Sequence, residues 1–452
     1  MLKLNSLAFF LVSTTQFVGG AAFADNFSSA NKIYTYSHKT SGIDNRLDVI
    51  VRGSSNLVGN SVRQTGGYKH YESTTSENWQ YPESGASGKQ ASIEQVWSVF
   101  DYAQNSAQFG ERNKAYIYQE GDENTAVFNQ GSEKHISIKR YRKAISGDSD
   151  ARKFYNNQFL QMPHEYKTFQ AEKSIDGLLR STQQGNQNTF RGHQLGESAT
   201  IYNFQIGDRN SVSALQVGEW DEAFVGQQGS YNVTNILQHD DAKNAVRRLA
   251  VSQTGDYNYA SIVQSDNAYV NFRLGQLLNI IQLAGNGNTA FVEQKNGAVS
   301  ANIMQKGSNN LHHLVQENAI ASPTTAYIVT IGNDNQASVR QDSGDSAAIV
   351  EQTGNQNIAL MWQQKAGAYG RITQIGDGNE AILYQEAVSV TAEITQEGDS
   401  NFLSVTQQLS DANLEFTQRG NNLSYEYIQV GEASDISIIQ EGSKSSVEII
   451  QF

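Results

Sequence analysis

Along most of the chain, apolar and polar residues alternate with a period of two, and each alternating segment ends on a glutamine. A clear example runs from Asn401 through Leu403 and Val405 to Gln407. Alternation of this kind places every second side chain on one side of a β-strand. The residues after each glutamine are rich in Gly, Asp, Asn and Ser, which favour a tight turn. Each segment therefore predicts one strand followed by one turn.

The closing glutamine returns every eleven residues. A fixed period of this kind is typical of repeat architectures, in which each unit is a structural copy of the last and equivalent side chains stack. The glutamines stand at Gln183, Gln194, Gln205, Gln216, Gln227 and Gln238, and again at Gln341, Gln352, Gln363, Gln374, Gln385, Gln396, Gln407, Gln418, Gln429, Gln440 and Gln451.

A second period is twice as long. Asparagine occupies the sixth place of alternate units, as at Asn188 and Asn210, whereas Ala199 and Asp221 take that place in the units between. One full coil is therefore twenty-two residues, with two strand–turn arms that build two facing sheets. Coils stacked about 4.8 Å apart would bring Gln over Gln and Asn over Asn. We expect an all-β fold, a β-solenoid of two-strand coils with amyloid-like cross-β stacking.

The inward amides and the turn glycines are the candidate residues for holding the stack together and for assembly. Glycine suits a turn that needs a positive φ or a close backbone approach. The candidate amides are Gln183, Asn188, Gln194, Gln205, Asn210, Gln216, Gln352, Asn357, Gln363, Gln374, Asn379, Gln385, Gln396, Asn401, Gln407, Gln418, Gln429, Gln440 and Gln451. The candidate glycines are Gly185, Gly207, Gly354, Gly376, Gly398, Gly420 and Gly442.

The repeat resembles the curlin repeat, the unit of curli amyloid fibre subunits. That family's pattern contains Gln-x-Gly-x-Gly-Asn-x-Ala-x-x-x-Gln, and residues 374–385 match every one of these positions. Residues 253–264 lack only the second Gly. The resemblance covers residues 183–452 and, briefly, 105–130. It implies a secreted structural subunit that assembles with its own copies and with other curlin subunits, and that meets curli-type secretion and nucleation factors.

Departures from the repeat divide the chain into expected regions. Residues 1–24 resemble a secretory signal peptide ending in Ala22-Phe23-Ala24, and residues 25–104 form an irregular region with degenerate repeats, with a loop over 70–90. A short repeat segment, 105–130, precedes a basic irregular insertion, 131–182, and the main solenoid follows over 183–452.

Three breaks in the period lie within the main solenoid. They come after Gln238, where four extra residues include Arg247 and Arg248, near 265–283, and after Gln316, where the extra residues include Pro323. We expect loops at these places. Phase breaks and the basic insertion fit a minor nucleating subunit as well as a bulk subunit of a fibre.

Composition narrows the possible functions. The net charge of −13 does not suit a general nucleic-acid binder, and the absence of cysteine leaves stability to the stacked strands. The apolar part of the signal peptide is too short to span a bilayer. We therefore expect an extracellular fibre at the bacterial cell surface, associated with the outer membrane through secretion and not spanning it.

No arrangement of residues indicates catalysis, a cofactor or a metal. His312 and His313 would face opposite sides of a strand, and we expect a packing or solvated role for them. The basic segment at Lys134, Lys139, Arg140, Arg142 and Lys143 is either an anionic docking site or a solvated loop. Outward aromatics such as Tyr257, Trp362, Tyr384 and Phe402 suit sugar binding or simple cross-strand packing.

The last unit closes at Gln451 with no polar cap, and an open strand edge is a template for another chain. The sequence thus favours a fibre subunit that grows by strand templating. The alternative is a monomeric β-solenoid adhesin or binding module with the solenoid as a stalk. A β-helix enzyme acting on carbohydrate is the remote third reading.

Overall fold

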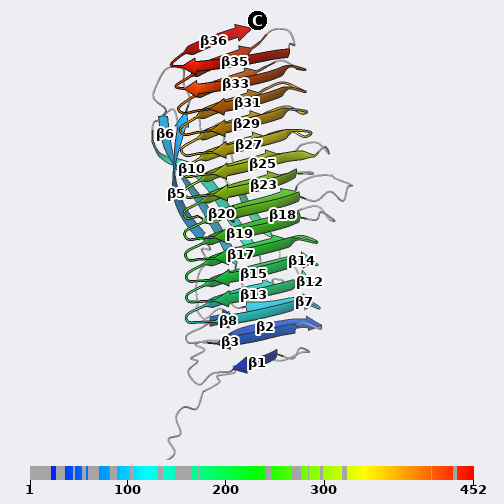
Figure 1. Ribbon diagram of the computed structural model, residues 1–452. Coiled ribbons are helices and arrows are strands. Elements are labelled where there is room, and N and C mark those ends of the chain that lie inside the picture. The colour runs from blue at the N-terminus through cyan, green and yellow to red at the C-terminus, as the bar shows by residue number, and fades with distance from the viewer. Residues whose placement is uncertain are drawn as a thin grey trace, which may run out of the picture.

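The computed structural model describes residues 22–26, 36–43, 46–52, 57–59, 71–81, 89–101, 106–130, 136–147, 165–169, 174–240, 247–266, 276–283, 285–295, 299–317, 323–408, 410–430 and 435–451. In these ranges every regular element is a β-strand. Figure 1 shows most of them stacked as the rungs of one column, from β1 (Ala22–Asn26) near its lower end to β36 (Ser446–Gln451) at its upper end.

The column consists of two parallel sheets. Sheet A has fifteen strands, in the order β1, β3 (Arg46–Arg52), β8 (Lys114–Glu120), β13 (Leu178–Gln184), β15 (Thr200–Ile206), β17 (Glu222–Gln228), β19 (Arg247–Thr254), β21 (Gln276–Leu283), β23 (Val299–Lys306), β25 (Thr324–Ile331), β27 (Ala347–Thr353), β29 (Tyr369–Ile375), β31 (Thr391–Glu397), β33 (Asn413–Asn421) and β35 (Asp435–Ser443).

Sheet B has seventeen strands and alternates with sheet A along the chain. Its members are β2 (Tyr36–Ile43), β4 (Leu57–Gly59), β7 (Ser106–Glu111), β9 (Thr125–Gln130), β12 (Ser174–Ile175), β14 (Thr189–Glu197), β16 (Ser211–Val217), β18 (Val233–Asp240), β20 (Tyr259–Asp266), β22 (Thr289–Lys295), β24 (Leu311–Glu317), β26 (Gln336–Gln341), β28 (Ile358–Gln363), β30 (Glu380–Gln385), β32 (Phe402–Gln407), β34 (Ser424–Gln429) and β36.

Each strand pairs with the strand one coil later, and equivalent residues of the repeat stand opposite each other. In sheet A, Gln183 pairs with Gln205, and Gln205 pairs with Gln227. In sheet B, Gln363 pairs with Gln385 in the same way. Regular coils are 22 residues apart along the chain. The predicted β-solenoid of two-strand coils is confirmed.

The core lies between the two sheets and follows the alternation read from the sequence. Leu403 and Val405 on β32 are fully buried, whereas their neighbours on the strand are half-buried. Small residues recur in one column of the core, as at the paired and fully buried Ala359 and Ala381. Burial of apolar side chains on one face of each sheet is the main force that holds the sheets together.

The structure differs from the expected loop over residues 70–90. Residues 71–81 form β5, which belongs to a separate antiparallel sheet of four strands in the order β11 (Glu165–Phe169), β10 (Ile136–Gly147), β6 (Lys89–Asp101) and β5. Two insertions of the solenoid thus pair with each other, and Lys139, Arg140, Arg142 and Lys143 of the basic segment lie on β10, whereas Lys134 lies outside the described residues. Because these paired segments are not repeats of one another, their pairing produces no periodic pattern in the sequence.

Two further boundaries, the start of the main solenoid and the end of the loop after Gln238, differ from those predicted from the sequence. The solenoid includes β12 and the start of β13, which lie before Gln183, because Leu178 pairs with Lys114 and Thr200 despite the missing glutamine motif. The loop expected after Gln238 does not include Arg247 or Arg248. Both residues belong to β19, where Arg248 pairs with Glu222. The remainder of that insertion, 241–246, lies outside the described residues.

Part of the predicted signal peptide, residues 1–21, and residues 318–322 after Gln316 also lie outside the described residues. Within the described ranges, no helix is long and apolar enough to cross a membrane.

Candidate functional site

Buried glutamines form a ladder of side-chain amides through each sheet. In sheet A, Gln374 Nε2 donates to Gln396 Oε1 at 2.9 Å, and Gln396 Nε2 donates to Gln418 Oε1 at 2.8 Å. Each amide also crosses the core, as Gln374 Nε2 donates to the Ile358 carbonyl of sheet B at 2.9 Å. Because these side chains are buried, the bonds satisfy amides that water cannot reach.

The candidate glutamines divide between the two ladders. The sheet A ladder contains Gln183, Gln205, Gln352, Gln374, Gln396, Gln418 and Gln440, and the sheet B ladder contains Gln194, Gln216, Gln363, Gln385, Gln407 and Gln429. All are at most 1% exposed except Gln440, at 8%. The side chain of Gln451 lies outside those that the structure describes. Their role in assembly remains a prediction.

Asparagine forms a third ladder at the turn from sheet A to sheet B. The backbone N–H of Asn379 donates to Asn357 Oδ1 at 3.0 Å, and Asn379 Nδ2 donates to the Gly398 carbonyl at 2.7 Å. Asn188, Asn210 and Asn401 make equivalent contacts. The ladder ends at Leu423, whose N–H still donates to Asn401 Oδ1.

The turn glycines of successive coils stack closely, with the carbonyl group of each glycine against the α-carbon of the equivalent glycine in the preceding coil. Gly376 has a φ of +118°, and a Cβ on it would collide with the carbonyl oxygen of Gly398. The same conformation and the same collision with the next coil hold for Gly185, Gly207, Gly354, Gly398 and Gly420. A Cβ on Gly442, in the last described coil, would meet nothing within 4 Å.

A second left-handed residue precedes the asparagine place in each turn. Gly378 fills it in the unit that matches the curlin pattern fully, with a φ of +66°. Other units keep the conformation without the glycine, with a φ of 57° at Gln356 and 59° at Tyr257. The missing second Gly therefore leaves the turn unchanged, at the usual small cost of a left-handed non-glycine residue.

One break in the sheet A ladder was not anticipated. Thr330 stands between Gln305 and Gln352, and the fully buried His312 stands in a column of alanines on the facing sheet. His312 Nε2 lies 3.1 Å from Thr330 Oγ1. Within the described part of the chain, Gln352 Oε1 and His312 Nδ1 have no hydrogen-bond partner. Burial lowers the pKa of His312 to about 3, so the ring is neutral at physiological pH.

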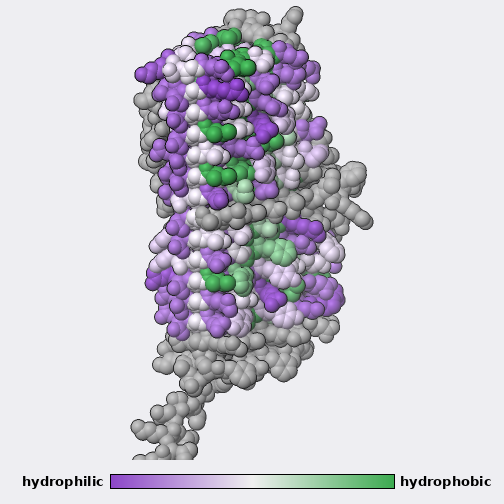
Figure 2. All heavy atoms as spheres, in the orientation of Figure 1, coloured by the Kyte–Doolittle hydropathy of each residue, from purple (hydrophilic) through white to green (hydrophobic). Residues whose placement is uncertain are grey.

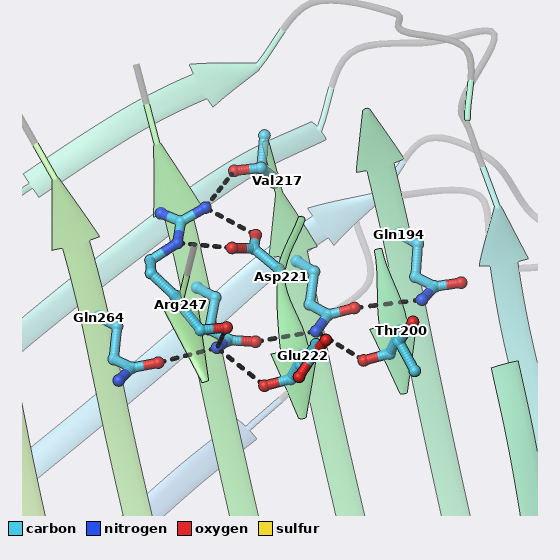
Figure 3. Close-up of polar contacts among 9 residues, drawn as sticks. Gln194, Thr200, Val217, Asp221, Glu222, Arg247 and Gln264 are labelled. Carbon is cyan, nitrogen blue, oxygen red and sulfur yellow. Dashed lines mark hydrogen bonds and ion pairs between the residues drawn. The ribbon is translucent and has the colours of Figure 1, made fainter. Parts of the chain in front are cut away.

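A buried ion pair was also missed (Figure 3). Arg247 Nε donates to Asp221 Oδ1 at 2.7 Å, and Arg247 Nη2 donates to Asp221 Oδ2 at 2.6 Å and to the Val217 carbonyl at 3.2 Å. Arg247 is 1% exposed and Asp221 is fully buried. In the sequence, Asp221 was noted only as a residue that takes the place of asparagine. Arg247 was not recognised as its partner, because the extra residues before Arg247 shift it out of the eleven-residue period.

The outward aromatic residues contact one another along the stack. Tyr257 stacks on Tyr231 with ring centroids 4.8 Å apart, and Trp362 lies beside Tyr384 at 4.9 Å. Trp362 Nε1 also donates to Asp342 at 2.7 Å. Figure 2 shows that green apolar residues on the face in view are interspersed with purple hydrophilic ones. Cross-strand packing accounts for these rings without a ligand.

The described residues contain no group of three or more His, Cys, Asp or Glu side chains placed to hold a metal ion. A comparison with curated proteins gives no match. A comparison with family models matches residues 207–239, which hold β16, β17 and most of β18. The matching family is the curlin associated repeat, and over these residues the match confirms the resemblance to the curlin repeat that was read from the sequence.

Proposed function

We propose that the protein is a structural subunit of extracellular curli-like fibres, to which copies add by extending both sheets and their amide ladders. A parallel solenoid has a backbone edge at each end of its stack, and such an edge accepts another strand. The fold and the family repeat support a structural role, and we assign no catalytic activity to it.

One observation carries the proposal. In the columns that run through Leu403 and Val405, both fully buried, the last described coil contributes Val447 and Ile449. These two side chains are 37% and 40% exposed. A coil of a second copy stacked on β35 and β36 would cover them and gain the same apolar burial as every inner coil. The incoming chain folds onto this edge, using it as a template.

The same edge offers amide donors. Gln440 Nε2, which in inner coils would donate to the next glutamine, donates to Ser445 Oγ at 2.8 Å. An added coil would supply the missing Oε1 acceptor. Replacing Gln440 and Gln451 by alanine should therefore slow assembly, and unchanged kinetics would contradict a role of this ladder in docking.

Secretion completes the proposal. Residues 1–24 act as a signal peptide, and curli-type secretion and nucleation factors deliver the chain to the cell surface, where fibres serve adhesion and biofilm matrix. The irregular coils between Gln238 and Gln341 fit a nucleating subunit as well as a bulk subunit.

The first experiment dilutes residues 25–452 from denaturant without seeds and follows an amyloid dye. A lag followed by fibres that seed fresh protein is the expected result. A stable soluble monomer rich in β-structure would overturn the proposal. That outcome would favour a monomeric adhesin, for which the four-stranded antiparallel sheet added to the solenoid is the supporting observation.

A matched pair of variants tests the direction of growth. Gly442→Ala adds a Cβ that meets nothing in the single chain but would collide with the glycine carbonyl of a docked coil. Gly226→Ala adds a Cβ that meets nothing on the outer face. We expect slow elongation for Gly442→Ala alone, and, because an L side chain at its φ of +127° is strained, a melting temperature below that of Gly226→Ala. Equal elongation rates would show that copies do not dock on this edge.

A further inference from the structure

A repeat solenoid faces a problem of register. If a strand shifts by one whole coil, Gln still stacks on Gln and Asn on Asn, so the ladders cannot distinguish the correct pairing from the shifted one. Register is weakly specified wherever equivalent residues are interchangeable. Residues that differ from their equivalents in other coils are then the only source of distinction.

The turn from sheet B to sheet A contains such a difference. The residue at the corner that leads into each sheet A strand, either the first residue of the strand or the one before it, belongs to a buried column, which we call the corner column. Asp221 and Arg247 are consecutive members of it, since Glu222 pairs with Arg248. The other described members with buried side chains carry no charge, and they are Asn113, Ala199, Val299, Thr324, Ser346, Ala368, Val390 and Ala412.

We propose that the Asp221–Arg247 pair is a register lock, which permits β19 to stack on β17 and penalises every pairing shifted by a coil. In any shifted pairing, Asp221 or Arg247 would lie against an uncharged member of the corner column. A buried charge without its partner is strongly unfavourable, whereas the intact pair is roughly neutral for stability. The pair therefore discriminates between registers without adding much stability.

The geometry of the Asp221–Arg247 pair indicates that it specifies the strand register and contributes little to the stability of the fold. Arg247 Nη1 is buried and has no hydrogen-bond partner among the described residues, so the pair does not satisfy all of its own donors. An interaction selected for stability alone would be replaced well by apolar residues, as in the coils with Ala368, Val390 and Ala412, which pack together. Figure 3 shows the pair beside the sheet B glutamine ladder, which continues past it to Gln264.

The position of the lock in the chain explains why it is needed. The ladder step from Gln227 to Gln253 is 26 residues, four more than the regular step of 22. Residues 241–246 fall between β18 and β19, so the chain length no longer dictates which strand follows. A second pair that differs from its equivalents in other coils is His312 and Thr330, which lie on the two sides of another insertion, 318–322, in the sequence. Here the large His312 side chain on sheet B contacts the small Thr330 side chain on sheet A.

Introduced cysteines can test the lock, because the chain has none of its own. Phe224 and Ala250 are Cα partners in the observed register, and Asn279 is the next partner of Ala250 in the same column. Neighbouring strands are close enough for a disulfide. A 224–250 cysteine pair reports the observed register, and a 224–279 pair reports a shift by one coil. Thr373 and Thr395 serve as a control pair in regular coils.

Each cysteine pair is placed in the native chain and in an Asp221→Ala/Arg247→Ala chain, refolded from denaturant and oxidised. We expect the 224–279 cross-link to rise at least several-fold in the alanine chain, with the 373–395 cross-link unchanged. An Asp221→Arg/Arg247→Asp chain should return the 224–279 cross-link toward the native level. Cross-linking yields that are the same in the native and alanine chains would overturn the proposal.

If the alanine chain fails to fold, an Asp221→Asn/Arg247→Gln chain, which removes both charges and leaves polar side chains that can hydrogen-bond, replaces it. The expected result and the result that would overturn the proposal are those given for the alanine chain. Because each readout is a ratio of cross-links within one soluble chain, the test does not depend on whether the protein forms fibres.

Discussion

The coils of residues 336–429 and those of residues 199–331 build the same two sheets in different ways. In the regular coils, the sheet A ladder runs from Gln352 to Gln418 in steps of 22 residues without a break, and one more such step leads to Gln440 in the last described coil. Between 199 and 331 the ladder steps include 26 and 30 residues, and Thr330 interrupts the sheet A ladder. The irregular coils also contain the Asp221–Arg247 pair.

The difference separates two requirements of a repeat protein. Identical coils add stability by repetition, because each new coil makes the same bonds as the last. They do not specify which coil pairs with which. The irregular coils lose ladder bonds but make contacts that occur once in the described structure. We therefore expect mutations in the two regions to differ in kind as well as in size.

The largest effect should come from removing one half of the buried pair. Arg247→Ala leaves Asp221 charged and buried, and we expect the free energy of unfolding to fall by about 3–5 kcal/mol. Arg371, whose Nη2 lies 2.7 Å from Glu351 on the outer face of the regular coils, is the matched control. Arg371→Ala should cost less than about 1 kcal/mol, because exposed pairs contribute little. Urea denaturation followed by circular dichroism measures both, and equal costs would contradict the comparison.

A glycine substitution gives the next effect. Gly376→Ala places a side chain at a φ of +118° and against the carbonyl of the next coil. We expect a cost of about 3 kcal/mol from strain and overpacking together. Gly226→Ala in the irregular coils meets open space, so its effect should stay within about 1 kcal/mol. Thermal melting of both variants is the measurement. A tolerated Gly376→Ala would mean that the coils can separate at little cost.

Repairing the ladder should make the irregular coils resemble the regular ones. The double variant His312→Ala/Thr330→Gln restores the alanine column and supplies a donor for Gln352 Oε1. We expect a gain of about 1–2 kcal/mol from the new buried hydrogen bonds. Thr330→Gln alone should destabilise the protein, because His312 occupies the space. Denaturation midpoints of the single and double variants test this non-additivity, and additive effects would contradict it.

The last effect is a pH dependence. Burial holds the pKa of His312 near 3, against 6.5 when the ring is free. Between these values the unfolded chain binds a proton that the folded chain does not, so stability is full above pH 6.5 and falls as the pH drops. The loss approaches about 1.4 kcal/mol per pH unit. The difference in denaturation midpoint between the native chain and His312→Ala, measured from pH 7 to pH 5, should narrow with acid. A constant difference would contradict this assignment.

The solenoid was predictable from the sequence because its signals are local. Alternation from Asn401 to Gln407 indicates a strand, and the eleven-residue return of glutamine indicates the stack. The antiparallel sheet was not predictable, since β6 and β10 share no pattern and pair across a long separation. Non-local pairing of this kind depends on the folded solenoid to bring the segments together.

The candidate site was predictable in part for the same reason. The positions of the ladder amides and turn glycines follow from the period alone. Arg247 was assigned to a loop because it breaks that period, and its partner Asp221 lies 26 residues away, off the regular step of 22. The absence of glutamine at position 330 was visible, but the compensating His312 is recognisable only once the facing sheet is in place.

The glutamine ladders have one physical consequence that concerns the electric field of the stack. In every step from Gln183 to Gln227 and from Gln352 to Gln440, the side-chain N–H points toward the later coil and the oxygen toward the earlier one. Each amide is chemically a peptide unit, with a dipole of about 3.5 D. Because these dipoles are aligned, they add along the axis as they do in an α-helix. A stack of such coils is therefore partially positive toward its C-terminal end and partially negative toward its N-terminal end. Anions should accordingly prefer the C-terminal end of the stack, and cations the N-terminal end.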